Sequence, residues 1–168
     1  MSLTDEGHYG PKQLNLLEVV WGEGFLSPGG TEEIDEIVKN TNLEGKSILD
    51  IGCGCGGAAF HLIKKYKAKS VEGIDPEHLV IETAHKLAKK NNLSELATFK
   101  QIKPGPLQYA DESFDVVFSK EAFLHIPDKE KLLKDVHRVL KPDGLVIVSD
   151  WMRIDDNPPS AQMKEYIE

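Results

Sequence analysis

An acidic residue and a cluster of glycines directly follow one apolar segment, and these residue types suit chemistry at a ligand. Residues 47–57 read Ser-Ile-Leu-Asp-Ile-Gly-Cys-Gly-Cys-Gly-Gly, so an apolar strand would enter a glycine-rich turn. Glycines let the backbone pass close to a ligand because no Cβ stands in the way. A helical pattern follows at once, and the free N–H groups at its start would point at the same ligand. The spacing therefore predicts a loop that binds a nucleotide cofactor.

Two cofactors fit the glycine spacing. Gly52, Gly54 and Gly57 satisfy the G-x-G-x-x-G pattern of dinucleotide-binding proteins. Asp75 would end a second strand, where a carboxylate can accept both hydroxyls of a ribose. These features suit NAD and S-adenosylmethionine (SAM) equally well. Asp50 favours SAM, because a carboxylate beside the loop repels a pyrophosphate but tolerates a sulfonium and an ammonium. NAD is the less favoured alternative.

Alternating strands and helices must position this loop. Alternation of this kind predicts a parallel sheet with helices on both faces, and ligands then bind at the carboxyl ends of the strands. Four polar residues would lie at such ends, namely Asp50, Asp75, Ser119 and Asp150. The expected strands are 46–51, 70–75, 97–101, 114–119 and 145–149, the last of them after a turn at 141–144, and the expected helices are 11–21, 31–40, 56–66, 77–91 and 127–140.

Composition narrows the class of protein. The 168 residues suit one domain, and a net charge of −8 argues against a nucleic-acid partner. No apolar run is long enough to span a membrane, so we expect no membrane partner. Cys53 and Cys55 are too close in sequence for a good disulfide, and no further cysteine or histidine pair completes a metal site. We therefore expect no metal and a reducing, cytoplasmic compartment.

From Tyr9 to Trp151 the chain resembles the class I SAM-dependent methyltransferases, and among them the phosphoethanolamine N-methyltransferases. Three segments carry the resemblance: Trp-Gly-Glu-Gly-Phe-Leu-Ser-Pro-Gly-Gly at 21–30, the glycine loop, and Ser-Lys-Glu-Ala-Phe-Leu-His-Ile at 119–126 with Arg-Val-Leu-Lys-Pro-Asp-Gly at 138–144. The resemblance implies a Rossmann-like α/β three-layer sandwich. It also implies an N-terminal helical lid over residues 1–30 and a SAM-binding core over residues 31–168.

The sheet is expected to lack the last two strands that this family usually adds, because only 18 residues follow Asp150. A five-stranded parallel sheet would then have an exposed edge, which is a site for unwanted pairing. We expect the N-terminal helices or a second copy of the chain to cover it. A homo-oligomer formed through this edge is one of the predicted partners.

The resemblance also implies roles for individual residues. Tyr9 in the lid and His125 after the fourth strand would form the catalytic pair over the substrate amine, with the histidine taking or sharing its proton. The alternatives are a lid aromatic without a chemical role and a structural histidine. Asp75 would bind the ribose, although it could instead simply cap the next helix. Ser27 would reach the carboxylate end of the cofactor, and the backbone of Lys120 would lie near its sulfonium. Pro76 would pack against the adenine. The remaining cofactor-binding residues would be Asp75 at the ribose and, at the methionine part, Asp50, Gly52, Cys53 and Gly54.

One position departs from the family pattern. An acidic residue that accepts from the adenine amino group usually follows the third strand, and Lys103 occupies that place. Lysine cannot accept a hydrogen bond. The predicted function is methyl transfer from SAM to the nitrogen of a small amine, phosphoethanolamine or its methylated forms, with S-adenosylhomocysteine as product. The alternatives are a sarcosine or dimethylglycine N-methyltransferase and a non-catalytic SAM-binding module.

Overall fold

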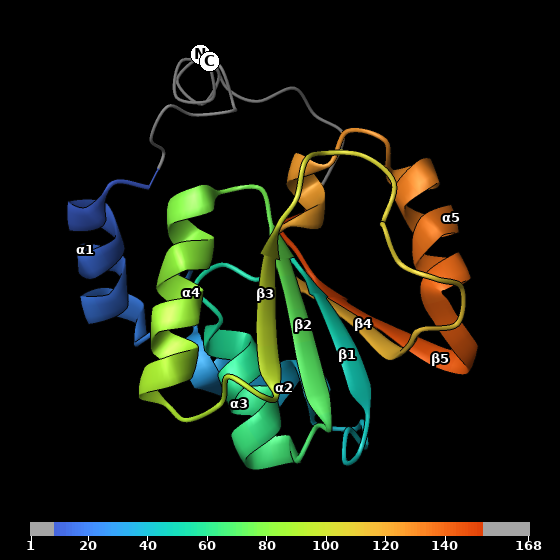
Figure 1. Ribbon diagram of the computed structural model, residues 1–168, viewed down its shortest axis with the longest axis horizontal. Helices are drawn as coiled ribbons and strands as arrows, with labels where there is room; N and C mark the ends of the chain where they lie inside the picture. Colours follow the sequence, from blue (N-terminus) through green and yellow to red (C-terminus); the bar gives the residue numbers. More distant parts are fainter. Residues whose placement is uncertain (1–8, 153–168) are drawn as a thin grey trace.

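Five parallel strands form the centre of the molecule in the computed structural model, which describes residues 9–152. Their order in the sheet is β3-β2-β1-β4-β5 (Figure 1). The chain therefore builds outward from β1 to β3 and then crosses back to place β4 on the other side of β1. Such a reversal opens a crevice at the carboxyl ends of the two central strands. The strands are β1 (Ser47–Ile51), β2 (Ser70–Asp75), β3 (Ala97–Gln101), β4 (Phe114–Lys120) and β5 (Leu140–Ser149).

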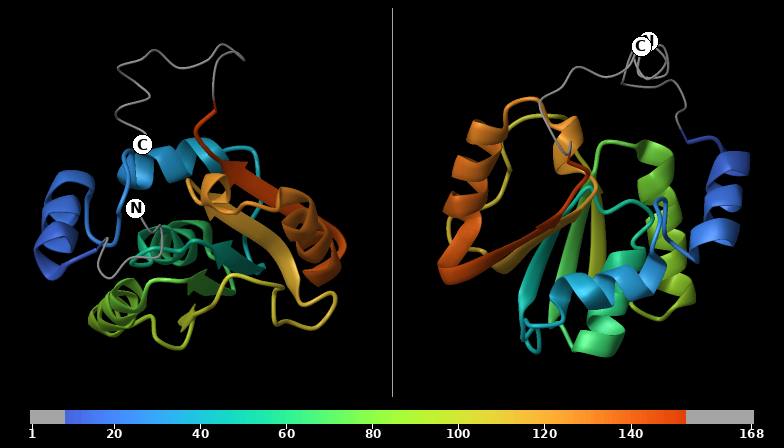
Figure 2. Two further views of the ribbon diagram at one scale, coloured as in Figure 1. Left: turned by 90° about the horizontal axis from the view of Figure 1, so that it is seen from above. Right: turned by 180° about the vertical axis from the view of Figure 1, so that it is seen from behind.

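Helices cover both faces of the sheet. Figure 2 shows α3 (Gly57–Tyr66), α4 (His78–Lys90) and α2 (Gly30–Val38) on one side of it and α5 (Lys129–Val139) on the other. Outside α4 lies α1 (Pro11–Trp21). Helices α2 to α5 turn apolar residues inward, as Val136 and Val139 of α5 illustrate with exposed fractions of 1% and 0%, whereas α1 buries only Leu14. The result is the three-layer α/β sandwich that the sequence predicts.

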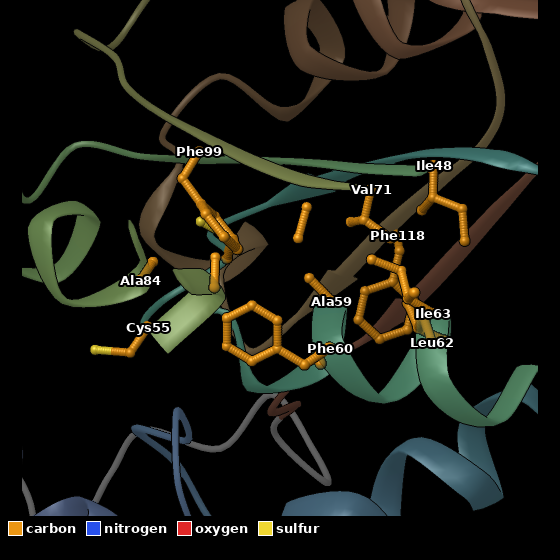
Figure 3. Close-up of a cluster of buried hydrophobic side chains, with 14 of the residues drawn as sticks. Ile48, Cys55, Ala59, Phe60, Leu62, Ile63, Val71, Ala84, Phe99 and Phe118 are labelled. Carbon is orange, nitrogen blue, oxygen red and sulfur yellow. The ribbon is translucent and has the colours of Figure 1, made fainter. Parts of the chain in front are cut away.

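The larger part of the core lies between the sheet and the layer of α3 and α4. The rings of Phe60 and Phe99 meet edge to face there with centroids 5.7 Å apart, close to the fully buried Val71 and Ala84 (Figure 3). Strands β1 and β4 are buried almost throughout because both of their faces are covered, whereas β2 alternates buried and partly buried residues. This core holds the carboxyl ends of the strands, and hence the glycine loop, at fixed positions.

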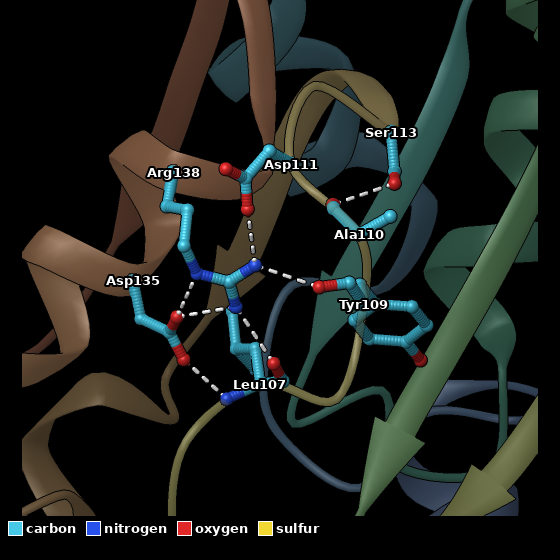
Figure 4. Close-up of polar contacts among 7 residues, drawn as sticks. All are labelled: Leu107, Tyr109, Ala110, Asp111, Ser113, Asp135 and Arg138. Carbon is cyan, nitrogen blue, oxygen red and sulfur yellow. Dashed lines mark hydrogen bonds and ion pairs between the residues drawn. The ribbon is translucent and has the colours of Figure 1, made fainter.

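On the opposite face, a loop over residues 102–113 joins β3 to β4 and replaces a covering helix. Arg138 of α5 holds it by donating to the carbonyls of Leu107 at 2.8 Å and Tyr109 at 2.6 Å (Figure 4). The same guanidinium pairs with Asp135 at 2.7 Å and Asp111 at 2.9 Å. The loop therefore packs as a defined layer of the structure.

The fifth strand differs from its prediction. It begins at Leu140 and not at residue 145, because Leu140 already pairs with Phe114. The expected turn at 141–144 is present as a register shift within the strand, with Asp143 at φ 61°. Within residues 9–152 no strand pairs with the outer edge of β5, whose Leu145 and Val146 are 45% and 46% exposed. In the same part of the chain, no helix combines the length and apolar character needed to cross a bilayer.

Candidate active site at the carboxyl ends of the strands

Asp75 joins the two segments that form the centre of the site. Its Oδ2 accepts a hydrogen bond from the backbone N–H of Gly54 at 3.1 Å, and its Oδ1 accepts from Glu77 N–H at 3.0 Å. Burial raises the pKa of this carboxyl, while the two hydrogen bonds oppose the rise. Asp75 thus makes no side-chain cap on α4, since its bond goes to the N–H of Glu77, which lies just before the helix, and it also holds the glycine loop. A carboxylate oxygen has more than one acceptor direction, so this arrangement leaves capacity for a ribose diol.

The glycines are needed where the loop meets its neighbours. Gly52 has φ +76°, and a Cβ there would lie 2.2 Å from the Cβ of Ala122, which follows β4. A Cβ on Gly24 would lie 2.8 Å from the backbone nitrogen of Gly57, and Gly57 N–H donates to the carbonyl of Gly24 at 3.1 Å. The segment before α2 is therefore bonded directly to the loop, and neither position accepts a larger residue.

Asp50 is a buried carboxylate with an unpaired oxygen. Its exposed fraction is 1%, and its Oδ2 has no hydrogen-bond partner. Burial, and then the charge of Asp75, raise the pKa of Asp50 to about 7. Burying an unpaired ionised group is costly, so a neighbouring positive charge would relieve the site. A cationic ligand beside Asp50 would favour the ionised form of its carboxyl.

Two buried thiols line the loop. Burial is the main cause that raises the pKa of Cys53 well above its ordinary value and that of Cys55 to about 12. Thiols are nucleophilic only when deprotonated, so both cysteines act as small apolar residues.

The structure places the two predicted catalytic residues in different parts of the site. Tyr9 is half-buried against the core, close enough to Asp75 and Glu77 for their charges, after burial itself, to raise the pKa of its hydroxyl. His125 is exposed at the end of the short 3-10 helix η1 (Phe123–His125). Among residues 9–152 no hydrogen bond joins Tyr9 to His125, and their pairing stays a prediction.

Three further polar groups stand at this edge of the sheet. Lys120 Nζ donates to Ser27 Oγ at 2.7 Å, and no local sequence pattern predicts this contact. The amide of Gln101, at the end of β3, donates to the carbonyl of Pro76 at 2.9 Å. Lys103 is exposed in the following loop. Sequence reasoning overlooked Gln101, although its place at the end of a predicted strand was a usable signal.

The strand order, the glycine loop after β1 and the acidic residue after β2 together define a class I methyltransferase fold. The chain belongs to the methyltransferase domain family, whose match covers residues 42–167. This membership confirms the class that the loop and its flanking segments indicate.

Relatives include phosphoethanolamine N-methyltransferases. Phosphoethanolamine N-methyltransferase 1 of Arabidopsis thaliana is 38% identical over 164 residues, which cover 97% of this chain and 33% of that protein. The structure of Haemonchus contortus phosphoethanolamine N-methyltransferase 2 in complex with SAM matches with a TM-score of 0.87 and 28% identity, over 97% of this chain and 38% of that one. A sterol 24-C-methyltransferase of Aspergillus fumigatus is 36% identical over 129 residues, or 74% of this chain and 34% of that protein. The chain thus spans about a third of the length of these curated relatives.

Proposed function

We propose that this chain forms the SAM-binding part of an N-methyltransferase that acts on a small amine, with phosphoethanolamine or its methylated forms as substrate. The observation that carries the proposal is the buried carboxylate of Asp50, with its unpaired oxygen, beside a glycine loop that Asp75 holds through the N–H of Gly54. A cation suits Asp50, and the ammonium and sulfonium of SAM are both cationic. The residues present therefore fit this cofactor.

Each part of the cofactor has a proposed partner. Asp50, Gly52, Cys53 and Gly54 would hold its methionine part, Asp75 its ribose and Pro76 its adenine. Ser27 would reach the carboxylate, and the backbone of Lys120 would lie near the sulfonium. When bound, SAM supplies a methyl group on a positively charged sulfur. The backbone N–H groups at the start of α3 and the loop glycines would allow close approach without a Cβ in the way.

The residues of this chain must position the amine and accept or share its proton. A protonated amine has no lone pair, so a base must take or share that proton before attack. We propose His125 for this role and Tyr9 as the residue that orients it when residues 1–30 close as a lid over the core at 31–168. Positioning and exclusion of water would supply most of the remaining acceleration.

The substrate assignment is supported by the N-methyltransferase relatives, one of which is described in complex with phosphomonomethylethanolamine and S-adenosylhomocysteine. A sarcosine or dimethylglycine N-methyltransferase is the alternative within the class. A cytoplasmic location, supported by the two buried free thiols, and pairing of two copies through the β5 edge complete the proposal.

Mass spectrometry of an amine pool incubated with the protein and methyl-labelled SAM tests the proposal. The pool contains phosphoethanolamine, its methylated forms, glycine, sarcosine and dimethylglycine. A labelled phosphoethanolamine derivative supports the full assignment, and labelled sarcosine or dimethylglycine changes the substrate. Binding of SAM without any labelled product would identify a non-catalytic SAM-binding module.

A further inference from the structure

Lys120 ends β4 with its side chain turned into the protein. Its side chain is only 6% exposed, which is unusual for a lysine. The neighbours of its ammonium come from three separate parts of the chain: the segment 25–30 before α2, the helix α2, and the residue that follows β4. Lysine carries three N–H donors and no acceptor, so its surroundings must supply oxygens.

Four oxygens surround the ammonium. Lys120 Nζ donates to Ser27 Oγ at 2.7 Å, to the carbonyl of Pro28 at 2.9 Å and to Glu121 Oε1 at 2.9 Å. Glu33 Oε2 lies 2.8 Å away and forms an ion pair with it, without the alignment of a hydrogen bond. One ammonium thus connects the end of β4 to the segment before α2 and to α2 itself.

Glu33 and Gly29 make this arrangement close-fitting. Gly29 has φ +91°, and a Cβ there would lie 2.4 Å from Glu33 Oε2. Glu121, at φ +54°, is held by its own backbone bond to the carbonyl of Ser149 at 2.8 Å. The backbone of Glu121 is therefore held independently of Lys120, and the ammonium is the group that bridges the two carboxylates.

The contact with Ser27 fixes the direction of a hydrogen bond. A serine hydroxyl can donate or accept, but toward an ammonium it can only accept. Its own proton is then free for another acceptor, and among residues 9–152 none is assigned to it. A carboxylate placed beside Ser27 would receive that proton in a hydrogen bond strengthened by charge.

We propose that Lys120 is a positioning residue that fastens the segment 25–30 to the end of β4 and holds the Ser27 hydroxyl as a donor toward the cofactor's carboxylate. This inference rests on the proposed function and goes beyond it, because the side chain of Lys120 gains a role that acts through Ser27. It follows that Lys120 matters for the amino-acid end of the cofactor and not for its nucleoside end.

Two ligands separate these ends. S-adenosylhomocysteine carries the amino-acid carboxylate, and 5′-methylthioadenosine lacks it. Isothermal titration calorimetry is run with both ligands on the wild type, Lys120→Met, Ser27→Ala and the double variant. We expect each single variant to lose about tenfold or more in affinity for S-adenosylhomocysteine, as for a hydrogen bond to a charged group. Affinity for 5′-methylthioadenosine should stay unchanged, and the double variant should lose little more than either single one.

Matched control variants separate a specific effect of Lys120 from the loss of any lysine that pairs with a carboxylate. Lys141→Met removes another lysine that pairs with a carboxylate of β4, Asp115 at 3.0 Å, away from the site, and should leave both affinities unchanged. Lys120→Arg keeps the charge and the donors and should restore most of the affinity. If Lys120→Met does not fold, Lys120→Gln, which keeps one donor group, takes its place. The readout is again the loss of affinity for S-adenosylhomocysteine relative to that for 5′-methylthioadenosine.

Three results would overturn the inference. Equal losses for both ligands would mean that Lys120 only supports the fold, and additive losses in the double variant would mean that it does not act through Ser27. Unchanged affinity for S-adenosylhomocysteine in Lys120→Met would remove the role altogether. If the wild type binds neither ligand, the proposed function is itself wrong and the inference falls with it.

Discussion

The carboxylate of Asp75 accepts the backbone N–H of Gly54 at 3.1 Å, across the ends of two neighbouring strands. The same side chain also accepts from the backbone N–H of Glu77, the residue before α4. One carboxylate therefore sets the distance between the glycine loop and the start of the next helix. Any ligand that binds here meets a loop that is already held in place, which lowers the ordering cost of binding.

Asp75→Asn should weaken the binding of S-adenosylhomocysteine by at least about tenfold. The amide has one acceptor oxygen where the carboxylate has two, so one of the backbone N–H groups loses its partner. Calorimetry provides the measurement. Asp115→Asn is the control, because Asp115 also accepts a backbone N–H, that of Ser47 at 2.8 Å, but stands at the opposite end of the sheet. Equal losses in both variants would contradict a local role for Asp75.

Asp50→Asn should change how the stability of the ligand-free protein depends on pH. The pKa of Asp50 is raised to about 7 from an ordinary 3.8, so between these values the folded chain keeps a proton that the unfolded chain has lost. The free energy of unfolding of the wild type therefore falls as pH rises through this window and levels off above it. Asparagine does not titrate, and the variant should lack this contribution.

Thermal unfolding at pH 5, 6, 7 and 8 without ligand provides the test for Asp50. The Tm of Asp50→Asn relative to that of the wild type should rise with pH and level off near pH 8. The same variant should bind S-adenosylhomocysteine more weakly, because the carboxylate that we propose faces the ligand's ammonium is gone. Parallel Tm curves for the two proteins would show that Asp50 is ionised throughout.

Lys103→Asp should strengthen the binding of S-adenosylhomocysteine. An aspartate after β3 supplies the acceptor for an adenine amino group that lysine lacks, and one such hydrogen bond contributes about 1 kcal/mol, or about fivefold in affinity. Lys103→Met is the matched control, because it removes the charge without adding an acceptor. A gain of the same size in both variants would assign the effect to the charge alone.

Gly52→Ala should destabilise the fold by about 1–3 kcal/mol, because its new Cβ would meet the Cβ of Ala122 at 2.2 Å and the backbone has a positive φ. Adding Ala122→Gly removes the clash but not the backbone strain. The double variant should therefore recover part of the loss. Urea unfolding of Gly52→Ala, Ala122→Gly and the double variant measures this, and no recovery would mean that strain at Gly52 is the whole effect.

Arg138→Met should lower the Tm and speed amide exchange in residues 102–113, because four acceptors lose their donor together. Hydrogen exchange read by mass spectrometry locates the change. Lys134→Met on the same helix removes an exposed ion pair with Glu130 and should alter neither quantity. Faster exchange across the whole sheet in Arg138→Met would mean that the loop is not the region it holds.

The sequence predicts most of the fold because its signals are local and agree with one another. The short strands that end at Asp50 and Asp75 alternate with amphipathic helical segments, and this alternation predicts the parallel sheet. The predicted start of β5 is wrong because the pairing of Leu140 with Phe114 outweighs the turn signal of Pro142 and Asp143. Tertiary pairing overrides local preference in such places.

The site is only partly readable from the sequence. Gly54 and Asp75 follow a spacing that many sheets share, and the structure brings them into contact as that spacing suggests. The ammonium of Lys120 contacts Ser27 and Glu33, which lie more than 80 residues away in the chain. No periodic pattern in the sequence predicts these contacts. Long-range side-chain contacts of this kind become visible only in three dimensions.

The central pair of strands also has a consequence for the order of folding. Ser119 of β4 donates to the carbonyl of Ile51 at the end of β1, 68 positions earlier. Contacts of such range form late, because a long stretch of chain must first be closed into a loop. During synthesis the glycine loop and Asp75 can meet while β4 is still absent. A growing chain would therefore form the part that we propose binds the nucleoside first, and the part that we propose binds the amino-acid end last.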